Sequence, residues 1–362
     1  MRSTVDKQLM SGTDAIGEAA IQAGCRYYFG YPITPQNELP EYMARRLSEV
    51  PGGVFIQAES ELAAINMVLG ASAGGGRTMT STSSPGMSLK QEGISYLAGQ
   101  ELPAVIVNVV RGGPGLGSIY SAQSDYFQST RGGGHGDYRT IVLAPASVQE
   151  MADMTALAFE LADTYRNPVI VQADGILGQM MEPIKISTRK RKKIPAKDYI
   201  VTGAKGRPSR LIASFTMDPK DQEEHNWKLF RKYQRMEQSE IRYETFLLED
   251  AKMAVLAYGT AARIARGAIK RLRKEGLKVG MIRPITLWPF PAKIIQETAK
   301  HLRDFFVFEM STGQMVEDVK LSLEGKGRIH FHGRPGGVFS TPAELSRIIS
   351  RHYYQSRRKR EG

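Results

Sequence analysis

Cysteine and long apolar segments are what this 362-residue sequence lacks. Its single cysteine, Cys25, excludes both an internal disulfide and an iron–sulfur cluster held by four cysteines of this chain. The longest apolar runs, such as residues 104–110, fall far short of the roughly 20 residues that a membrane-spanning helix needs. The opening residues, MRSTVDKQLMSG, lack the apolar segment of a secretory signal. We therefore expect a soluble protein of the cytoplasm that does not bind a membrane.

Phosphate-binding and metal-binding signatures are also missing. The sequence contains no G-x-x-x-x-G-K-[ST], and its glycine-rich loop at residues 111–117 does not match G-x-G-x-x-G. An ATPase or a dinucleotide-binding oxidoreductase therefore loses its usual support. His330 and His332 flank Phe331 in an alternating strand pattern, but no third ligand type lies nearby. We predict no metal site formed by this chain alone.

The formal net charge of +12 is concentrated in two segments. Residues 185–210 contain ten Lys or Arg against one acid, and residues 351–362 contain five against one. These segments carry +9 and +4, which leaves −1 for the remainder. Because the basicity is local, we do not predict nucleic-acid binding. A solvated linker, or a patch for an acidic protein partner, is the favoured interpretation.

Helical periodicity alternates with short β-branched runs between residues 9 and 184. Strict alternation predicts βαβ units, and hence a doubly wound parallel sheet with helices on both faces. Ligands of such sheets bind at the carboxyl ends of the strands. Unusual loops fall at these ends, at residues 30–35, 57–60, 83–86 and 111–117. The expected strands are 27–29, 54–56, 77–82, 104–110, 141–144 and 168–173, and the expected helices are 15–23, 39–47, 61–73, 87–98 and 147–164.

A second domain is predicted after a change in composition, because a chain of this length suffices for two domains. Residues 185–250 are charged and are interpreted as a linker with a helix through 221–248. The alternation then returns and predicts a smaller α/β domain over residues 251–354. Residues 1–8 and 355–362 are expected to be tails. The expected strands are 253–258, 279–282, 305–309 and 328–331, and the expected helices are 260–275, 291–302, 314–323 and 342–354.

A stiff loop, Tyr31-Pro32-Ile33-Thr34-Pro35, directly follows a predicted strand. Two prolines fix its backbone and hold the Thr34 hydroxyl in one orientation, where it can hydrogen-bond a substrate oxygen. A rigid strand-to-helix turn without a ligand explains the same residues.

Glu61 opens a predicted helix directly after Ser60. The helix dipole favours an acid in the first turn with Ser60 as N-cap, so a purely structural role is one explanation. The other is catalytic. A carboxylate against N1′ of an aminopyrimidine favours the imino form, whose nitrogen takes the C2 proton of a thiazolium. Glu59, two residues earlier, is the competing candidate.

Two further loops have little side-chain bulk at predicted strand ends. The segment Ser84-Pro85-Gly86 and the run that begins at Arg111 let a flat ring or a carboxylate approach the backbone. Arg111 is a planar, permanent cation suited to a carboxylate, although a lone arginine is also a common structural residue.

A long, polar and glycine-rich segment covers residues 120–137. Loops of this length inside a compact domain are usually functional. Of the six histidines, we expect only His135, in this segment, to lie near the ligand edge of the sheet.

The sequence resembles the alpha-type subunit of 2-oxoacid:ferredoxin oxidoreductases over nearly its whole length. The resemblance rests on GYPITP, the SE–LAAI–VLGAS–GG–T–TS–SPG block, VRGGPGLG and RPITLWPFP. The stretch GLGSIYSAQSDYFQSTRGGGHGDYRT is most similar to the 2-ketoisovalerate (3-methyl-2-oxobutanoate) branch. The resemblance implies a thiamine diphosphate pyrimidine-binding domain followed by a domain like the transketolase C-terminal domain.

The resemblance also implies roles for single residues. The catalytic acid falls on Glu61, the substrate-contacting threonine on Thr34 and the carboxylate-binding arginine on Arg111. The implied reaction is coenzyme A-dependent oxidative decarboxylation of a 2-oxoacid, with electrons passing singly through iron–sulfur clusters to ferredoxin. Implied cofactor contacts are Tyr31, Pro32, Ile33, Glu61, Ser84, Pro85 and Gly86, and implied substrate contacts are Thr34, Arg111, Tyr120, Gln123 and Ser124.

The sequence lacks the motif that binds the diphosphate in complete thiamine diphosphate enzymes. The sequence lacks the G-D-G that, with a downstream Asn, commonly holds Mg²⁺ and the diphosphate. The resemblance therefore implies that a beta-type subunit holds both, that [4Fe-4S] clusters lie on partners, and that gamma- and delta-type subunits complete an assembly. This chain alone is expected to be inactive. The same subunit acting on 2-oxoglutarate or pyruvate, and a non-catalytic scaffold, remain alternatives.

Overall fold

A computed structural model describes residues 7–186 and 197–361. Its N-terminal part holds a seven-stranded sheet in the order β12-β6-β7-β5-β4-β2-β3. Every neighbouring pair except β12 with β6 is parallel, so the parallel sheet that the alternating pattern predicted is confirmed for the other strands. The strands are β2 (Tyr27–Gly30), β3 (Val54–Gln57), β4 (Thr78–Thr82), β5 (Ala104–Val110), β6 (Ile141–Leu143), β7 (Pro168–Asp174) and β12 (Thr286–Trp288).

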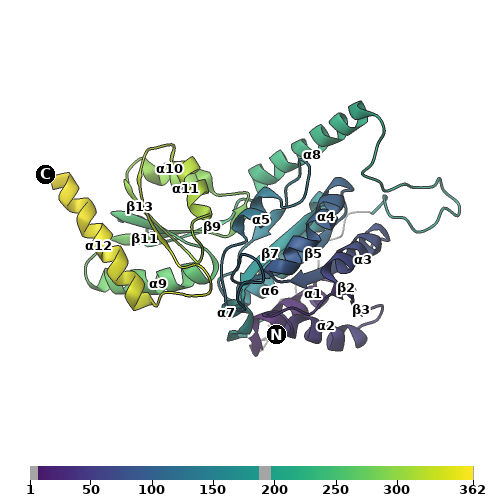
Figure 1. Ribbon diagram of the computed structural model, residues 1–362, viewed down its shortest axis with the longest axis horizontal. Helices are drawn as coiled ribbons and strands as arrows, with labels where there is room; N and C mark the ends of the chain where they lie inside the picture. The colour runs from purple at the N-terminus through teal and green to yellow at the C-terminus, as the bar shows by residue number, and fades with distance from the viewer. Residues whose placement is uncertain (1–6, 187–196, 362) are drawn as a thin grey trace, which may run out of the picture.

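Helices cover both faces of this sheet, which is the predicted doubly wound arrangement (Figure 1). The first helix packs against the second and the sixth, whereas the third and fourth pack against each other. A two-stranded antiparallel pair, β1 with β8, lies beside them. These elements are α1 (Gly12–Gln22), α2 (Glu38–Ser48), α3 (Glu61–Ala73), α4 (Ser84–Gly99), α5 (Tyr126–Arg131), α6 (Val148–Tyr165), α7 (Gly175–Gln179), β1 (Gln8–Ser11) and β8 (Met181–Ile184).

The C-terminal part holds a five-stranded sheet in the order β14-β13-β10-β11-β9. All neighbours are parallel except β9 with β11. Helix α9 packs with α12, and α10 packs with α11. The elements are β9 (Tyr243–Phe246), β10 (Met253–Leu256), α9 (Gly259–Lys274), β11 (Val279–Pro284), α10 (Ala292–Ala299), β13 (Asp304–Glu309), α11 (Met315–Leu323), β14 (Arg328–Gly333) and α12 (Pro342–Glu361).

Three predictions for this half of the chain were wrong. The helix expected at 221–248 is α8 (Pro219–Ser239), and the residues after it form β9 at the edge of the second sheet. Residues 286–288, expected inside the second domain, instead extend the first sheet as β12. Residues 355–361, expected as a tail, continue α12, because no Gly or Pro interrupts the helix there.

The two sheets share a continuous core. One cluster of buried side chains runs from the first sheet through Leu287 and Trp288 to Leu256 and Phe305 of the second. Polar contacts cross the same boundary: Arg283 donates from both terminal nitrogens to the Glu150 carboxylate, at 2.7 Å each. In the described part of the chain, no helix combines the length and apolarity needed to cross a membrane.

Candidate functional site

The carboxyl ends of β3, β4, β2 and β5 lie at one edge of the first sheet, and the candidate residues follow them. Glu61 begins α3, and the Ser60 hydroxyl caps this helix by accepting from the Ala63 amide at 3.1 Å. The Glu61 side chain is 95% buried, whereas the competing Glu59 is exposed. Geometry therefore favours Glu61 as the acid at this edge.

Gly86 fits directly against Glu61. A Cβ atom at this position would collide with the Thr82 hydroxyl and the Glu61 carboxylate, and it would approach Glu61 Cγ to 2.6 Å. The glycine thus lets the first turn of α4 lie on the catalytic candidate. Of the neighbouring candidates, Ser84 and Pro85 are half-buried at the start of the same helix.

Arg111 joins three loops through backbone contacts. Its guanidinium donates to the Thr34 carbonyl at 3.0 Å and to the Leu116 carbonyl at 3.1 Å. Its amide donates to the Ser84 hydroxyl at 3.1 Å, and the Ser124 hydroxyl donates to its carbonyl at 3.4 Å. Arg111 is buried, and its Nε has no hydrogen-bond partner among the described residues. The structure therefore brings Thr34, Ser84, Ser124 and Arg111 together.

A buried hydroxyl network supports the Tyr31–Pro35 loop from below. Tyr28 on β2 pairs with the Ser81 hydroxyl on β4 at 2.5 Å, and Ser81 donates to the side-chain carbonyl of Gln36. Gln36 is fully buried and donates to the Tyr31 carbonyl at 3.4 Å. Burial raises the pKa of Tyr28, so the phenol stays neutral. Tyr31, Pro32, Ile33 and Thr34 reach the surface, exposed or half-buried.

Two predicted substrate contacts lie toward the C-terminal part instead. The Gln123 amide is buried, donates to the Tyr258 carbonyl at 2.9 Å and accepts from the Met310 amide at 2.9 Å. Both of its polar atoms thus have protein partners. Tyr120 is 66% exposed and lies beside Gly337. Their substrate roles stay predictions.

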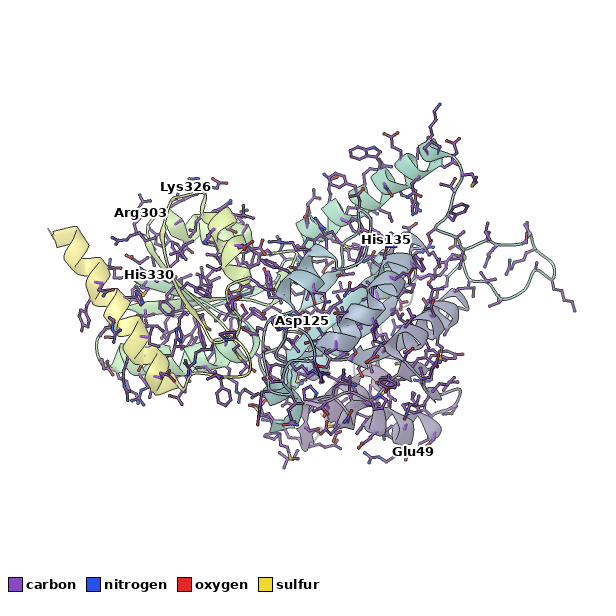
Figure 2. All side chains as sticks on the ribbon, viewed as in Figure 1. Glu49, Asp125, His135, Arg303, Lys326 and His330 are labelled. Atoms are coloured by element: carbon purple, nitrogen blue, oxygen red, sulfur yellow. The ribbon has the colours of Figure 1, made fainter. Side chains whose placement is uncertain are left out.

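His135 is not at the ligand edge, and this prediction was wrong. Helix α5 carries the chain along α4, and the His135 carbonyl accepts from Ser95 near the far end of α4 at 2.7 Å. Ser84 and Ser95 are eleven residues apart on this helix, which is about 16 Å. Figure 2 shows His135 well apart from Asp125, which lies near the candidate site.

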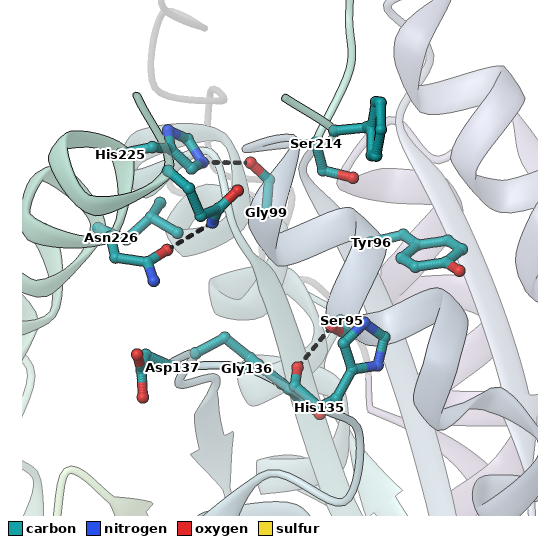
Figure 3. A pocket seen from close by; sticks show the side chains of 13 residues that line it. Ser95, Tyr96, Gly99, His135, Gly136, Asp137, Ser214, His225 and Asn226 are labelled. Atoms are coloured by element: carbon teal, nitrogen blue, oxygen red, sulfur yellow. Dashed lines mark hydrogen bonds between the residues drawn. The ribbon is translucent and has the colours of Figure 1, made fainter. Parts of the chain in front are cut away.

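A cavity of about 380 Å³ lies at this far end. Tyr96 and His135 line it on one side, and Ser214 and His225 on the other (Figure 3). Glu61 is not part of its wall. This cavity is therefore separate from the catalytic candidate.

Lys90 is a site residue that our sequence analysis missed. It is fully buried on α4, and its Nζ donates to the Glu61 carbonyl at 3.3 Å. Burial lowers the pKa of Lys90 to about 7, against the opposing effect of the Glu61 charge. The sequence held one signal for a buried lysine: Lys90 lies at helical spacing from two glycines, Gly86 and Gly93.

These residues fit the pyrimidine of thiamine diphosphate. Glu61 is a buried residue whose side chain makes no hydrogen bond or ion pair within the described residues, and its carboxylate oxygens are not among the fully buried unpartnered atoms, so they remain accessible. An accessible carboxylate that has no partner of its own can accept a hydrogen bond from a ligand nitrogen. The described residues form no candidate metal site, because no three His, Cys, Asp or Glu side chains lie close enough together to bind one ion.

Comparison with known proteins gives the family. Residues 18–245 match "Pyruvate flavodoxin/ferredoxin oxidoreductase, thiamine diP-bdg", and residues 251–345 match "Pyruvate:ferredoxin oxidoreductase core domain II". The chain belongs to the 2-oxoacid:ferredoxin oxidoreductase family. This confirms the resemblance and the expected thiamine diphosphate-binding fold, and it makes the chain an oxidoreductase subunit.

Relatives of this oxidoreductase family cover almost the whole chain. The ketoisovalerate oxidoreductase subunit VorB of Methanothermobacter marburgensis is 51% identical over 94% of this chain and 97% of its own length. The 2-oxoglutarate synthase subunit KorA of the same organism is 38% identical over 94% of this chain and 97% of its own length.

Solved structures agree on the fold. The 2-oxoglutarate:ferredoxin oxidoreductase of Magnetococcus marinus, solved with 2-oxoglutarate, coenzyme A and succinyl-CoA, superposes with a TM-score of 0.83 at 29% identity. This chain spans 65% of that chain, which covers 96% of this one. A split-gene transketolase, at 13% identity and a TM-score of 0.59 over 94% of this chain and 97% of its own, shows the shared fold alone.

Proposed function

We propose that this chain is the alpha-type subunit of a 2-oxoacid:ferredoxin oxidoreductase that acts on 2-ketoisovalerate. The observation that carries the proposal is Glu61, a buried residue at the sheet edge whose carboxylate stays accessible and has no hydrogen-bond or ion-pair partner among the described residues. The complex would convert the 2-oxoacid and coenzyme A to acyl-CoA and CO₂ while reducing ferredoxin. The substrate rests on 51% identity to a ketoisovalerate subunit against 38% to a 2-oxoglutarate subunit.

The roles of the residues follow from their positions. Thiamine diphosphate supplies the carbon nucleophile for decarboxylation. Glu61 would hold a proton against pyrimidine N1′, and Gly86 would let the first turn of α4 pack closely against that side chain. Arg111 would stiffen the Thr34 and Leu116 loops and present a positive charge to the substrate carboxylate. Thr34, supported by Arg111, would contact a substrate oxygen, with Ser124 behind it.

A beta-type partner would complete the site. The chain has no G-D-G for Mg²⁺ and the diphosphate, and its single cysteine leaves [4Fe-4S] clusters to beta-, gamma- or delta-type subunits. Exposed apolar side chains near the candidate residues support a covering subunit. They are Leu62, Leu89, Leu116, Ile119 and Tyr120.

Co-purification followed by mutation of Glu61 tests this function. The wild-type chain should co-purify with a subunit that carries G-D-G and cysteines, and the complex should turn over 2-ketoisovalerate faster than 2-oxoglutarate or pyruvate. Glu61→Ala should lower turnover by about 10²–10⁴-fold, because a positioned proton-transfer group contributes that much. Glu59→Ala is the matched control and should leave turnover unchanged.

Each contrary result has a specific meaning. Normal turnover by Glu61→Ala in an intact complex would favour a scaffold subunit over a catalytic one. Faster turnover of 2-oxoglutarate would reject the substrate while leaving the family role in place.

A further inference from the structure

A lysine is buried in the seam between α3 and α4, directly behind the candidate catalytic residue. Lys90 has no solvent exposure, and its Nζ lies 3.3 Å from the Glu61 carbonyl oxygen. The two helices pack side by side, as Figure 1 shows. A buried ammonium is costly unless it is paired, so packing alone does not explain a lysine at this position.

Two glycines bring the helices close enough to seal this lysine in. Gly86 precedes Lys90 by four residues and Gly93 follows it by three, so all three face α3. A Cβ at Gly86 would collide with the Glu61 carboxylate, and one at Gly93 would lie 2.5 Å from Ile65 Cγ2. The same close approach that positions Glu61 thus also excludes water from Lys90.

Glu61 is the charge that acts on Lys90. Helix α4 packs on α3, β5 and β7. Strand β5 has no titratable side chain, and the acid of β7, Asp174, caps α7 by accepting from the Ile176 and Leu177 amides. Because burial lowers the pKa of Lys90 to about 7, this amine changes charge close to neutral pH.

We propose that Lys90 is a positioning residue that acts through Glu61. Its ammonium attracts the carboxylate, fixes the first turn of α3, and biases the proton shared with pyrimidine N1′ of thiamine diphosphate toward the pyrimidine. The inference rests on the proposed function. As the pH rises and Lys90 loses its charge, the bias is lost.

The test uses the assembled complex with the full-length chain, thiamine diphosphate and Mg²⁺. The circular-dichroism band of the bound aminopyrimidine is recorded from about pH 6 to pH 9, on either side of the Lys90 pKa of about 7. The wild-type band should change near pH 7. Lys90→Met should show the wild-type high-pH band at every pH, and its turnover at pH 6 should fall about tenfold, which corresponds to a loss of ~1.4 kcal/mol of transition-state stabilisation.

Two variants keep the test decisive. Lys232→Met is the control, because Lys232 is also buried but donates a hydrogen bond to Glu101, away from Glu61. This variant should keep the wild-type pH dependence. Lys90→Arg retains a permanent charge and should show the low-pH band throughout. If Lys90→Met does not form the complex, Lys90→Arg alone decides between the outcomes.

The outcomes separate this inference from the proposed function. A wild-type pH dependence of the band in Lys90→Met, or in Lys90→Arg, overturns the role of Lys90 alone. A wild-type complex that binds no thiamine diphosphate overturns the proposed function and this inference together.

Discussion

At the residue scale, the Glu61 carboxylate can take its position only because residue 86 is a glycine and has no side chain. A methyl group added at Gly86 would collide with both the Thr82 hydroxyl and the Glu61 side chain. Glu61 itself could be identified from the sequence, because its Ser60 cap and helix start have a local signature. Lys90 has only a weak signal, its helical spacing from Gly86 and Gly93, because burial of a lysine depends on the distance between two helices.

Gly86→Ala should therefore displace Glu61 without unfolding the protein. We expect thiamine diphosphate affinity of the complex to fall about tenfold or more, because overpacking a closed contact typically costs 1–3 kcal/mol. Calorimetric titration with the cofactor measures this. Gly70→Ala is the matched control: nothing lies within 4 Å of a Cβ at this α3 position, so affinity should not change and helix stability should rise slightly. Equal affinities for the two variants would refute the fit of Gly86.

At the element scale, the alternating pattern predicted the long elements well and the short ones poorly. Strands β5 and β7 are buried over their whole length, so their apolar runs are visible in the sequence. Strand β12 has three residues beside a proline, and its partner β6 lies about 140 residues earlier. No local signal specifies such a pairing. The position of His135 is also set by contacts between segments that are distant in the sequence, so it could not be predicted from the glycine-rich loop itself.

Attachment of α8 offers a test at this scale. Glu101 accepts hydrogen bonds from Lys228 and from Lys232, whose side chain is buried. Burial lowers the pKa of Lys232 to about 8 despite the opposing charge of Glu101. Glu101→Gln leaves this ammonium without its carboxylate, so we expect a loss of about 3 kcal/mol in urea unfolding and faster proteolysis around α8.

The exposed partner of the same carboxylate is the control. The Lys228 side chain is 58% exposed, so Lys228→Met should cost at most about 1 kcal/mol. Comparable losses for Glu101→Gln and Lys228→Met would contradict the importance of the buried pair.

At the scale of the whole molecule, the two α/β domains share part of a core and are not joined by a linker alone. The core is continuous through Trp288, and β12 crosses from the C-terminal part into the first sheet. Composition had indicated a charged linker over 185–250 with a helix through 221–248, whereas the structure ends that helix at Ser239 and adds β9 to the second sheet. A sequence pattern reports helices and strands, whereas contacts between distant segments decide whether the domains are independent.

The Arg283–Glu150 pair across this boundary allows the coupling of the two domains to be tested. Burial raises the pKa of Glu150, but the hydrogen bonds and charge of Arg283, together with the Ala146 amide and the Arg266 charge, hold it below its ordinary value of 4.5. Glu150→Gln leaves the buried Arg283 without this carboxylate. Because Glu150 is partly exposed, we expect a loss of about 2 kcal/mol, which lowers the unfolding temperature by about 3 °C for a chain of this size.

Acid should remove the difference between wild type and variant. A carboxylate whose pKa is depressed by folding stabilises the protein above its unfolded pKa, and this contribution is lost as the pH falls through the folded value. The gap in unfolding temperature, measured by calorimetry, should thus be constant above about pH 5 and shrink below pH 4. Glu324→Gln, which disrupts an exposed pair with Lys326, is the control and should show no gap. Two separate unfolding transitions in the wild type would contradict this coupling of the two domains.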